Sequence, residues 1–568
     1  MEVTAQATFV ATLVDEWVRA GVRHAVVAPG SRSTPLALAL AADERLRLHV
    51  HLDERSAGYL ALGVALAEGA PAVVLTTSGT AAVELHPAVV EAAQASVPMI
   101  VCTADRPAEL KGVGAPQTID QTHLYGRAVR WCAEPGPADE ASSGSWRSLA
   151  ARAAAEACGP PAGPVHLNLA FVDPLVGAAG PLPAARPGGR PWHATAGAPG
   201  VPGAADGAGA RALLRAPRGV IVAGRGADWD SVSLVAERFG WPVLADSRSS
   251  CRRPGEVTVA AADALLRHPP FAAAHRPEAV LRVGEPPASK VVAQWLAGAG
   301  GEQVVLDGGS AWSDPDRTAS LVVRGDPGAW CRRLASCPPE QVDPAWLASW
   351  SAAEAAAQRS FDAVLAGHDE VTEPAVARRL AAALPDGSTL VCSSSMPVRD
   401  VEWYGAPRLG LRVVANRGTN GIDGVVSTAV GVATGSGART ALLVGDLAYL
   451  HDGNGLLGLA GRRLDLTIVV VDNRGGGIFS FLRQAEVLPA DRFELLFGTP
   501  QEVDLAALAV AHGLPVLQAH DGEGFDVALA AALATPGTSV VMVRTDRARN
   551  VAVHAELHAA VAAALPEP

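Results

Sequence analysis

Hydrophobic and polar positions along the chain follow two alternating patterns. Apolar residues recur at helical spacing from Phe9 to Ala20, and 24–28 is then a short apolar run that ends at Pro29 and Gly30. The order of helix, strand and loop repeats along the rest of the chain. Strands that alternate with helices form parallel sheets covered on both faces, so the pattern predicts an α/β fold of doubly wound sheets.

Three such units follow one another, and the first and third are similar in plan. Stretches that predict strands lie at 48–52, 72–76, 219–223, 242–245, 279–283, 303–306, 389–392, 412–415, 441–444, 467–471 and 539–543. A Gly/Pro/Ala-rich stretch at 173–210, which includes Pro199 and Pro202, predicts a linker because it sustains neither a helix nor a central strand. We expect domains at 1–185, at 186–345 with the linker at its start, and at 346–568.

Composition and charge narrow the class of protein. The 568 residues exceed what one hydrophobic core supports, and 46 Lys and Arg against 58 Asp and Glu give a net charge of −12. That charge repels nucleic acids and anionic membranes, and no apolar run is long enough to span a bilayer. Seven scattered cysteines without a CxxC pair, and a first segment without the features of a signal peptide, predict a cytoplasmic protein.

Two polar loops in the third unit follow neighbouring predicted strands. Asp446 lies in Gly445-Asp446-Leu447, and Asn473 begins Asn473-Arg474-Gly475-Gly476-Gly477 after the next strand. Ligands bind at the carboxyl ends of parallel strands, and Mg²⁺ prefers oxygen ligands such as these, with the backbone carbonyl of Gly475 as a third. A magnesium ion held by few protein groups implies a phosphorylated ligand. The alternative is a helix cap at Asp446 and an ordinary turn at 473–475.

The spacing of this Gly-Asp and the later Asn resembles the thiamine-diphosphate signature. Upstream, the loop 416–424 follows a strand and contains Ile422, which the resemblance makes the apolar support for the bent cofactor. Thiamine chemistry needs a carboxylic acid against the aminopyrimidine ring, and Glu54, at a strand-to-helix junction, fits that role. The alternative is that Glu54 is an ordinary acidic residue in the first turn of a helix, where it compensates the helix dipole.

More specific motifs resemble the 2-succinyl-5-enolpyruvyl-6-hydroxy-3-cyclohexene-1-carboxylate synthase family of menaquinone biosynthesis, over essentially the whole chain. These motifs are 28–36, 77–81, 104–107 with Gln117, 395–399, 445–447 and 478–482. The resemblance implies a transferase with a thiamine-diphosphate-binding fold, Mg²⁺ or alternatively Mn²⁺, and a homodimer or dimer of dimers with its active site between subunits. It implies that Glu54 is catalytic and that the metal ligands are Asp446, Asn473 and Gly475. The implied cofactor contacts are Glu54, Thr77, Gly79, Thr80, Ile422, Gly445, Asp446, Leu447, Asn473, Gly475, Gly477 and Ile478.

The substrates implied by this family are 2-oxoglutarate and isochorismate, which are dicarboxylates and need cations. The implied contacts are Ser31, Arg32, Arg106, Gln117, Lys290, Ser395, Arg399, Arg417, Ile478, Phe479 and Leu482. Guanidinium and ammonium groups suit carboxylates, although each of these cations could instead be an ordinary surface residue. Val291 after Lys290 and Pro116 before Gln117 depart from the family pattern and leave the isochorismate contacts less certain.

Three other functions stay open at this level. Another thiamine-dependent decarboxylase or an acetolactate-synthase-like carboligase would share the cofactor residues. A nicotinamide oxidoreductase would need a GxGxxG turn, of which Gly224-Arg225-Gly226 is only a fragment. A catalytically silent binding module would be expected to lack Glu54, Asp446 or Asn473, and all three are present.

Overall fold

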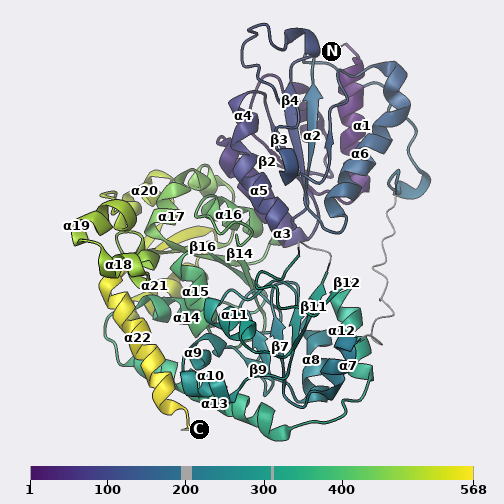
Figure 1. The fold of residues 1–568 in the computed structure, drawn as a ribbon. Helices are drawn as coiled ribbons and strands as arrows, with labels where there is room; N and C mark the ends of the chain where they lie inside the picture. The colour runs from purple at the N-terminus through teal and green to yellow at the C-terminus, as the bar shows by residue number, and fades with distance from the viewer. Residues whose placement is uncertain (1, 194–207, 309–311, 567–568) are drawn as a thin grey trace. The chain divides into compact units, whose positions relative to one another are not determined.

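The computed structural model describes residues 2–193, 208–308 and 312–566 and contains three six-stranded sheets in series along the chain (Figure 1). Every recorded strand register within these sheets is parallel. The expectation of three doubly wound α/β sheets is therefore confirmed. None of the described helices is both long enough and apolar enough to cross a bilayer.

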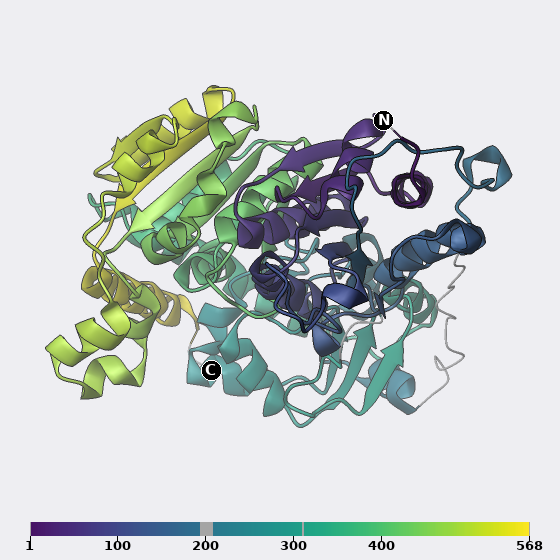
Figure 2. The ribbon, with the colours of Figure 1, turned by 90° about the horizontal axis from the view of Figure 1, so that it is seen from above.

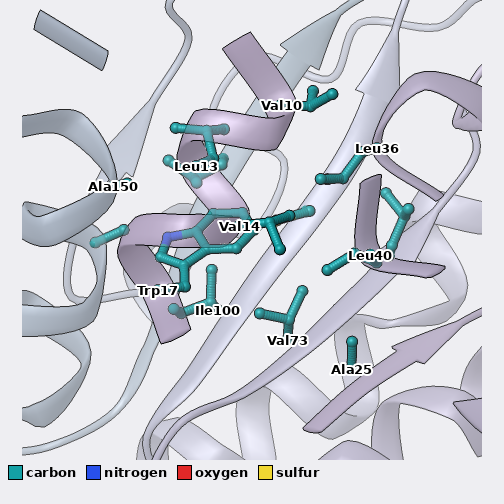
Figure 3. Packing of buried hydrophobic residues seen from close by; sticks show 14 of the residues in the cluster. Val10, Leu13, Val14, Trp17, Ala25, Leu36, Leu40, Val73, Ile100 and Ala150 are labelled. Atoms are coloured by element: carbon teal, nitrogen blue, oxygen red, sulfur yellow. The ribbon is translucent and has the colours of Figure 1, made fainter. Parts of the chain in front are cut away.

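The first sheet has the strand order β2-β1-β3-β4-β6-β5. Its strands are β1 (His24–Val27), β2 (Arg47–Val50), β3 (Ala72–Thr76), β4 (Met99–Asp105), β5 (Cys132–Ala133) and β6 (Pro164–Ala170). Its helices are α1 (Ala5–Arg19), α2 (Thr34–Ala42), α3 (Glu54–Glu68), α4 (Thr80–Glu84), α5 (His86–Gln94) and α6 (Ser143–Cys158). Figure 3 shows Trp17 and Val14 of α1, with Leu36 of α2, packed over Val73 and Ile100 of the sheet.

The third sheet repeats this topology in the order β14-β13-β15-β16-β18-β17, which confirms that the first and third units share a plan. Its strands, green to yellow in Figure 2, are β13 (Ser388–Cys392), β14 (Leu411–Ala415), β15 (Thr440–Gly445), β16 (Leu466–Asp472), β17 (Val516–Ala519) and β18 (Thr538–Arg544). The helices of this part are α14 (Glu373–Ala383), α15 (Met396–Tyr404), α16 (Val425–Ser436), α17 (Asp446–His451), α18 (Arg483–Val487), α19 (Ala490–Phe493), α20 (Leu505–Ala511), α21 (Gly522–Ala534) and α22 (Arg547–Ala564).

The middle sheet has a different order, β12-β11-β10-β7-β8-β9, which is that of dinucleotide-binding folds. Its strands are β7 (Gly219–Ala223), β8 (Val243–Ala245), β9 (Thr258–Val259), β10 (Ala279–Val283), β11 (Glu302–Asp307) and β12 (Leu321–Arg324). Its helices are α7 (Ala208–Arg215), α8 (Trp229–Phe239), α9 (Ala262–Leu266), α10 (Pro269–Ala274), α11 (Lys290–Ala297), α12 (Pro327–Ser336) and α13 (Pro344–Ala366). Apolar clusters on both faces of this sheet complete a doubly wound layer.

Two details of the secondary structure differ from the sequence patterns or extend them. The strands β4, β5, β6, β9, β12 and β17 were not among the predicted ones. In β6, buried His166 and Asn168 interrupt the apolar run, and β5 and β9 have two residues each, too few to show a period. After β15 the chain forms α17 and two short 3₁₀ turns, Gly453–Leu456 and Leu459–Gly461. The second turn starts after Gly458 at φ 68°, a conformation that ends helices.

The expected linker lies only partly within the described residues. Over 173–193 the described chain has one 3₁₀ turn, Pro187–Gly189, and an isolated bridge between Val3 and Ala178. The part that contains Pro199 and Pro202 lies outside the described residues. The boundaries expected from the sequence therefore stay predictions.

Candidate functional site

The residues singled out from the sequence fall into two compact units. One comprises Met1–Gly197, Asn416–Ala438 and Tyr449–Leu466, and the other comprises Ala198–Ala415, Arg439–Ala448 and Thr467–Pro568. The first contains Ser31, Arg32, Glu54, Thr77, Gly79, Thr80, Arg106, Gln117, Arg417 and Ile422. The second contains Lys290, Ser395, Arg399, Gly445, Asp446, Leu447, Asn473, Gly475, Gly477, Ile478, Phe479 and Leu482.

Glu54 is the first residue of α3 and is half-buried. Asp53 caps the helix by accepting from Ser56 N, and it also accepts from Asn454 Nδ2 at 2.7 Å. Arg55 donates to the carbonyl of His451 at 2.8 Å. The neighbours on both sides of Glu54 are thus tied down, while no described residue donates a hydrogen bond to its carboxylate. The chain on both sides of Glu54 is therefore anchored, and its carboxylate remains available to a ligand.

The turn after β3 is built around Gly79, whose φ of 84° favours glycine. Gly79 N donates to Gln121 Oε1 at 3.0 Å, and Gln117 Nε2 donates to the carbonyl of Ser78 at 3.0 Å. Thr77 is buried in the same turn, and a Cβ at Gly30 would lie 2.3 Å from Thr77 Cβ. The structure therefore brings the loops at 30, 77–80 and 117 together. Thr80 is exposed at the start of α4, and Ser31 is exposed at the edge of the 30 loop.

Arg106 extends this cluster with a half-buried guanidinium group. Its Nη1 donates to the carbonyl of Gln117 at 3.0 Å and also to the hydroxyl of Ser78. Burial, and after it the charge of Arg32, lowers the pKa of Arg106. Arg32 donates to the carbonyl of Phe171 at 3.1 Å and lies 3.5 Å from Asp173, which is largely exposed. Two neighbouring cations of this kind can bind a carboxylate ligand.

The loop 416–424 carries Arg417 and Ile422, both half-buried. Glu91 of α5, with 1% of its surface exposed, accepts hydrogen bonds from Gly418 N at 2.8 Å, Thr419 N at 2.6 Å and Thr419 Oγ1 at 2.7 Å. Further along, Tyr59 of α3 donates to Asp423. The loop that presents Arg417 and Ile422 is therefore fixed by helices of the first sheet.

Asp446 begins α17 at the end of β15 and is 7% exposed. Its Oδ1 accepts from Leu447 N at 2.8 Å, and its Oδ2 accepts from Gly475 N at 2.6 Å. Burial raises the pKa of Asp446 to about 6, because the two backbone hydrogen bonds offset only part of the desolvation. The loops after β15 and β16 thus meet, as the spacing of Asp446 and Asn473 predicted.

Asn473 follows β16 and is 8% exposed. Its Nδ2 donates to Glu373 Oε1 at 2.8 Å, whereas its Oδ1 is buried and has no hydrogen-bond partner in the described part of the chain. A Cβ at Gly477 would lie 2.6 Å from Asn473 Nδ2, and one at Gly475, whose φ is 136°, would lie 2.1 Å from the carbonyl of Gly498. Both glycines are therefore needed for the close packing of this loop. Burial, and after it the charge of Asp400, raises the pKa of Glu373.

These residues fit a divalent cation. The Asp446 carboxylate is buried without an ion-pair partner among the described residues, and a buried charge of this kind is costly unless a counter-charge is bound. The orphaned Asn473 Oδ1 supplies a second oxygen. Within the described part of the chain, no group of three or more His, Cys, Asp or Glu side chains could hold a metal. A metal site built here must therefore use amide or backbone oxygens as well.

Ser395 and Arg399 lie together at the start of α15. Ser395 precedes the helix with a φ of 75°, and Arg399 donates to the carbonyl of Ser395. Burial lowers the pKa of the half-buried Arg399 guanidinium, although the neighbouring Asp400 opposes this change. Arg399 thus lies one residue from a fully buried acid, at the carboxyl end of β13, where a ligand can reach it.

The remaining residues that the sequence assigned to substrate make fewer contacts with the other predicted site residues. Lys290 is exposed at the first position of α11, where a cation opposes the helix dipole, and no described contact joins it to another predicted substrate residue. Ile478 and Phe479 are half-buried after the glycine loop, and Phe479 packs on Phe497 with ring centroids 5.5 Å apart. Leu482 is 42% exposed.

Sequence reasoning missed three residues that organise these loops. Gln121 is fully buried, binds Gly79, and donates to the carbonyl of Ala104 and to Asn168 Oδ1. Glu91 and Glu373 were missed as well. The one available signal was a lone acid within the apolar stretch 88–93 for Glu91, whereas Glu373 after Thr372 looks like an ordinary helix start.

Comparison with family models matches three consecutive regions of the chain. Residues 7–124 match the thiamine pyrophosphate enzyme N-terminal TPP-binding domain, 207–392 match the middle domain of thiamine pyrophosphate enzymes, and 408–543 match the C-terminal TPP-binding domain. Each match includes one of the three sheets in whole or in large part.

Curated relatives extend this similarity to nearly the full length. A protein of Myxococcus xanthus is 44% identical over 573 residues, covering 98% of this chain and 97% of its own length. A protein of Thermobifida fusca is 47% identical, covering 97% of this chain and 98% of its own, and one of Chloroflexus aurantiacus is 43% identical, covering 98% and 97%. All three are named 2-succinyl-5-enolpyruvyl-6-hydroxy-3-cyclohexene-1-carboxylate synthase.

Proposed function

Because this chain belongs to the 2-succinyl-5-enolpyruvyl-6-hydroxy-3-cyclohexene-1-carboxylate synthases, a family of thiamine-diphosphate-dependent enzymes, we propose that it carries out the same carbon–carbon bond formation in menaquinone biosynthesis. The reaction decarboxylates 2-oxoglutarate and adds the succinyl unit to the ring alkene of isochorismate. The observation that carries the proposal is the sequence identity: the chain is 43–47% identical to these three relatives, and each comparison covers 97–98% of the chain. A plain decarboxylase or an acetolactate-synthase-like carboligase is not favoured, since these relatives all carry the synthase name.

The cationic loops support polyanionic substrates. In the first unit, Arg32 and Arg106 lie close enough for the charge of one to lower the pKa of the other. In the second, Arg399 is half-buried in the first turn of α15, the helix that follows β13. We assign Arg399, Ser395 and Arg417 to the 2-oxo acid or its neighbouring acceptor, and Arg32, Arg106, Ser31, Gln117 and Lys290 to substrate carboxylates. Ile478, Phe479 and Leu482 would form the apolar wall. Arginine suits this role because its guanidinium group binds carboxylates with two parallel hydrogen bonds.

Glu54 is assigned as the acid that holds a proton against the pyrimidine ring of thiamine diphosphate. When bound, that cofactor supplies the nucleophilic carbon and accepts the electron pair released by decarboxylation. The open carboxylate of Glu54, between the two anchored residues Asp53 and Arg55, supports this role. Thr77, Gly79, Thr80 and Ile422 would contact the same half of the cofactor, and Gly445, Leu447, Gly477 and Ile478 the other half.

We propose that Asp446, Asn473 and the carbonyl of Gly475 hold Mg²⁺, or alternatively Mn²⁺, against the diphosphate. Within the described residues, Asn473 Oδ1 has no hydrogen-bond partner and the Asp446 carboxylate has no ion-pair partner, and both observations support this assignment. Asp446→Ala should abolish the magnesium-dependent binding of thiamine diphosphate, which calorimetry measures. Unchanged binding would mean that the metal site is misplaced.

The family resemblance supports a proposal for the assembly, and the unpaired cysteines support one for the cellular location. We propose a homodimer or a dimer of dimers with its active site between subunits, domains at 1–185, 186–345 and 346–568, and a cytoplasmic location. All seven cysteines lie within the described residues and are unpaired, as a reducing compartment allows.

The test of the function is a reconstituted reaction. Purified protein is mixed with thiamine diphosphate, Mg²⁺, 2-oxoglutarate and isochorismate, and carbon dioxide and the joined product are measured. Product formation that requires both substrates is the expected outcome. Rapid release of carbon dioxide without isochorismate would instead identify a plain decarboxylase.

Glu54→Gln tests the catalytic assignment in the same assay. The variant should fold and bind the cofactor but lose turnover by about 10²–10⁴-fold, since a positioned acid or base contributes that much. Glu68→Gln, at the other end of α3, changes the charge equally and should retain turnover. Turnover close to wild type in Glu54→Gln would refute the assignment.

A further inference from the structure

Glu373 occupies an unusual place for a helix-starting acid. It is the first residue of α14, after the N-cap Thr372, and acids at this position are ordinarily solvent-exposed compensation for the helix dipole. Here the residue is only 4% exposed. Burial of a carboxyl group costs free energy unless its oxygens have hydrogen-bond partners. The partners of Glu373 therefore indicate its role.

Those contacts come from the ends of two strands. Asn473 Nδ2, just after β16, donates to Glu373 Oε1 at 2.8 Å, and Thr545 Oγ1, just after β18, donates to the same oxygen at 3.0 Å. Thr545 N in turn donates to the carbonyl of Asp472 at 3.0 Å. Glu373 is therefore fixed against the loop that follows β16, 100 residues away in sequence.

The hydrogen bond from Asn473 to Glu373 uses the nitrogen end of the Asn473 amide and leaves its oxygen end for another partner. Because Nδ2 donates to a carboxyl oxygen, Oδ1 is the end that is buried with no partner among the residues that the structure describes. A flipped amide would set its oxygen against an oxygen of Glu373 and would present an NH₂ group where a metal ligand is needed. The close approach of Nδ2 to the backbone at Gly477 leaves the nitrogen end tightly enclosed.

We propose that Glu373 is a positioning residue that fixes the Asn473 amide so that its oxygen faces the divalent cation. The inference rests on the metal site proposed above and assigns Glu373 no contact with substrate. Outer-shell partners of this kind orient metal ligands, and their loss typically weakens metal binding by 10–100-fold.

Metal binding itself is the readout. Apoenzyme with saturating thiamine diphosphate is titrated with Mn²⁺, and free Mn²⁺ is followed by electron paramagnetic resonance. Glu373→Ala should raise the dissociation constant of Mn²⁺ by about 10–100-fold. Glu373→Gln, which keeps an acceptor oxygen for Asn473 and Thr545, should stay close to wild type. Equal losses in both variants would show that charge alone matters and would overturn the proposal.

Two further variants separate orientation from folding. Glu354 of α13 is a buried acid that accepts from Ala260 N and Ala261 N, away from Asn473. Glu354→Ala should lower the melting temperature without a change in Mn²⁺ affinity. Asn473→Asp replaces the amide with two equivalent oxygens, so adding Glu373→Ala in that background should cause no further loss. A persistent 10-fold loss there would overturn the proposal.

Mn²⁺ affinities of two variants distinguish a wrong metal site from a wrong role for Glu373. Asn473→Ala should weaken Mn²⁺ binding whether or not Glu373 orients the side chain. If Asn473→Ala leaves Mn²⁺ affinity unchanged, the proposed metal site is wrong and the role of Glu373 falls with it. If Asn473→Ala weakens binding and Glu373→Ala does not, the site stands and only the positioning role is overturned.

Discussion

At the scale of single residues, buried carboxylates act on the loops that present functional groups. Glu91 accepts three hydrogen bonds from Gly418 and Thr419, directly after Arg417. A Cβ at Gly418 would lie 2.7 Å from the carbonyl of Glu91, so loop and helix are in close contact. Glu91 therefore determines where the Arg417 loop lies, although it is not assigned to touch any ligand.

Glu91→Ala should weaken substrate binding more than it slows the chemical step. Each hydrogen bond to a charged group contributes about 1.5–3 kcal/mol to the stability of the loop. If the displaced loop cost Arg417 only about 1.4 kcal/mol of substrate-binding free energy, KM would rise about tenfold. Steady-state kinetics with 2-oxoglutarate measure this change. The exposed Glu84 of α4 offers the control, because Glu84→Ala should leave KM unchanged. A normal KM in Glu91→Ala would show that the loop holds its position without this carboxylate.

At the scale of elements, α3 and α16 pack closely within one unit because glycines lie at their crossing. A Cβ at Gly63 would lie 2.1 Å from the carbonyl oxygen of Thr428, and a Cβ at Gly431 would lie 2.1 Å from that of Leu60. Both clashes involve backbone atoms, which cannot move aside cheaply. The same α3 carries Glu54 at its first position and Tyr59 against the 416–424 loop.

Gly63→Ala should therefore destabilise the first unit and disturb its functional end. Overpacking typically costs about 1–3 kcal/mol, which should lower the melting temperature in differential scanning fluorimetry. Gly461→Ala is the matched control, since a Cβ there would have no atom of the described residues within 4 Å. If the two variants melt at the same temperature as wild type, the helices can separate without cost and the crossing is not close-packed in solution.

At the scale of the whole molecule, the first and third sheets share one strand order, and each carries one group of the residues that we assign to the cofactor. The first sheet carries Glu54 after β2, and the third carries Asp446 and Asn473 after β15 and β16. Each sheet presents its residues at the carboxyl ends of its strands, where parallel sheets bind ligands. An active site between subunits would combine one half-site from each chain.

Mixing two inactive variants tests that arrangement. Glu54→Gln and Asp446→Ala chains, coexpressed so that subunits mix, should form heterodimers with one intact and one doubly altered site. Random pairing then restores about a quarter of wild-type activity, because half of the dimers are mixed and each has one working site. Glu54→Gln mixed with Glu54→Ala should restore none. Absence of recovery in the first mixture would place both groups of one site on a single chain.

Local periodicity and chain order were enough to predict the α/β class, the series of three sheets and the positions of Glu54, Asp446 and Asn473 after strands. The packed structure was needed to show that Asn473 Nδ2 donates to Glu373, and that Glu373, Glu91 and Gln121 hold the loops. Those contacts join residues 100, 327 and 42 positions apart. No periodicity in the chain encodes such pairs, which arise only when separate elements pack together.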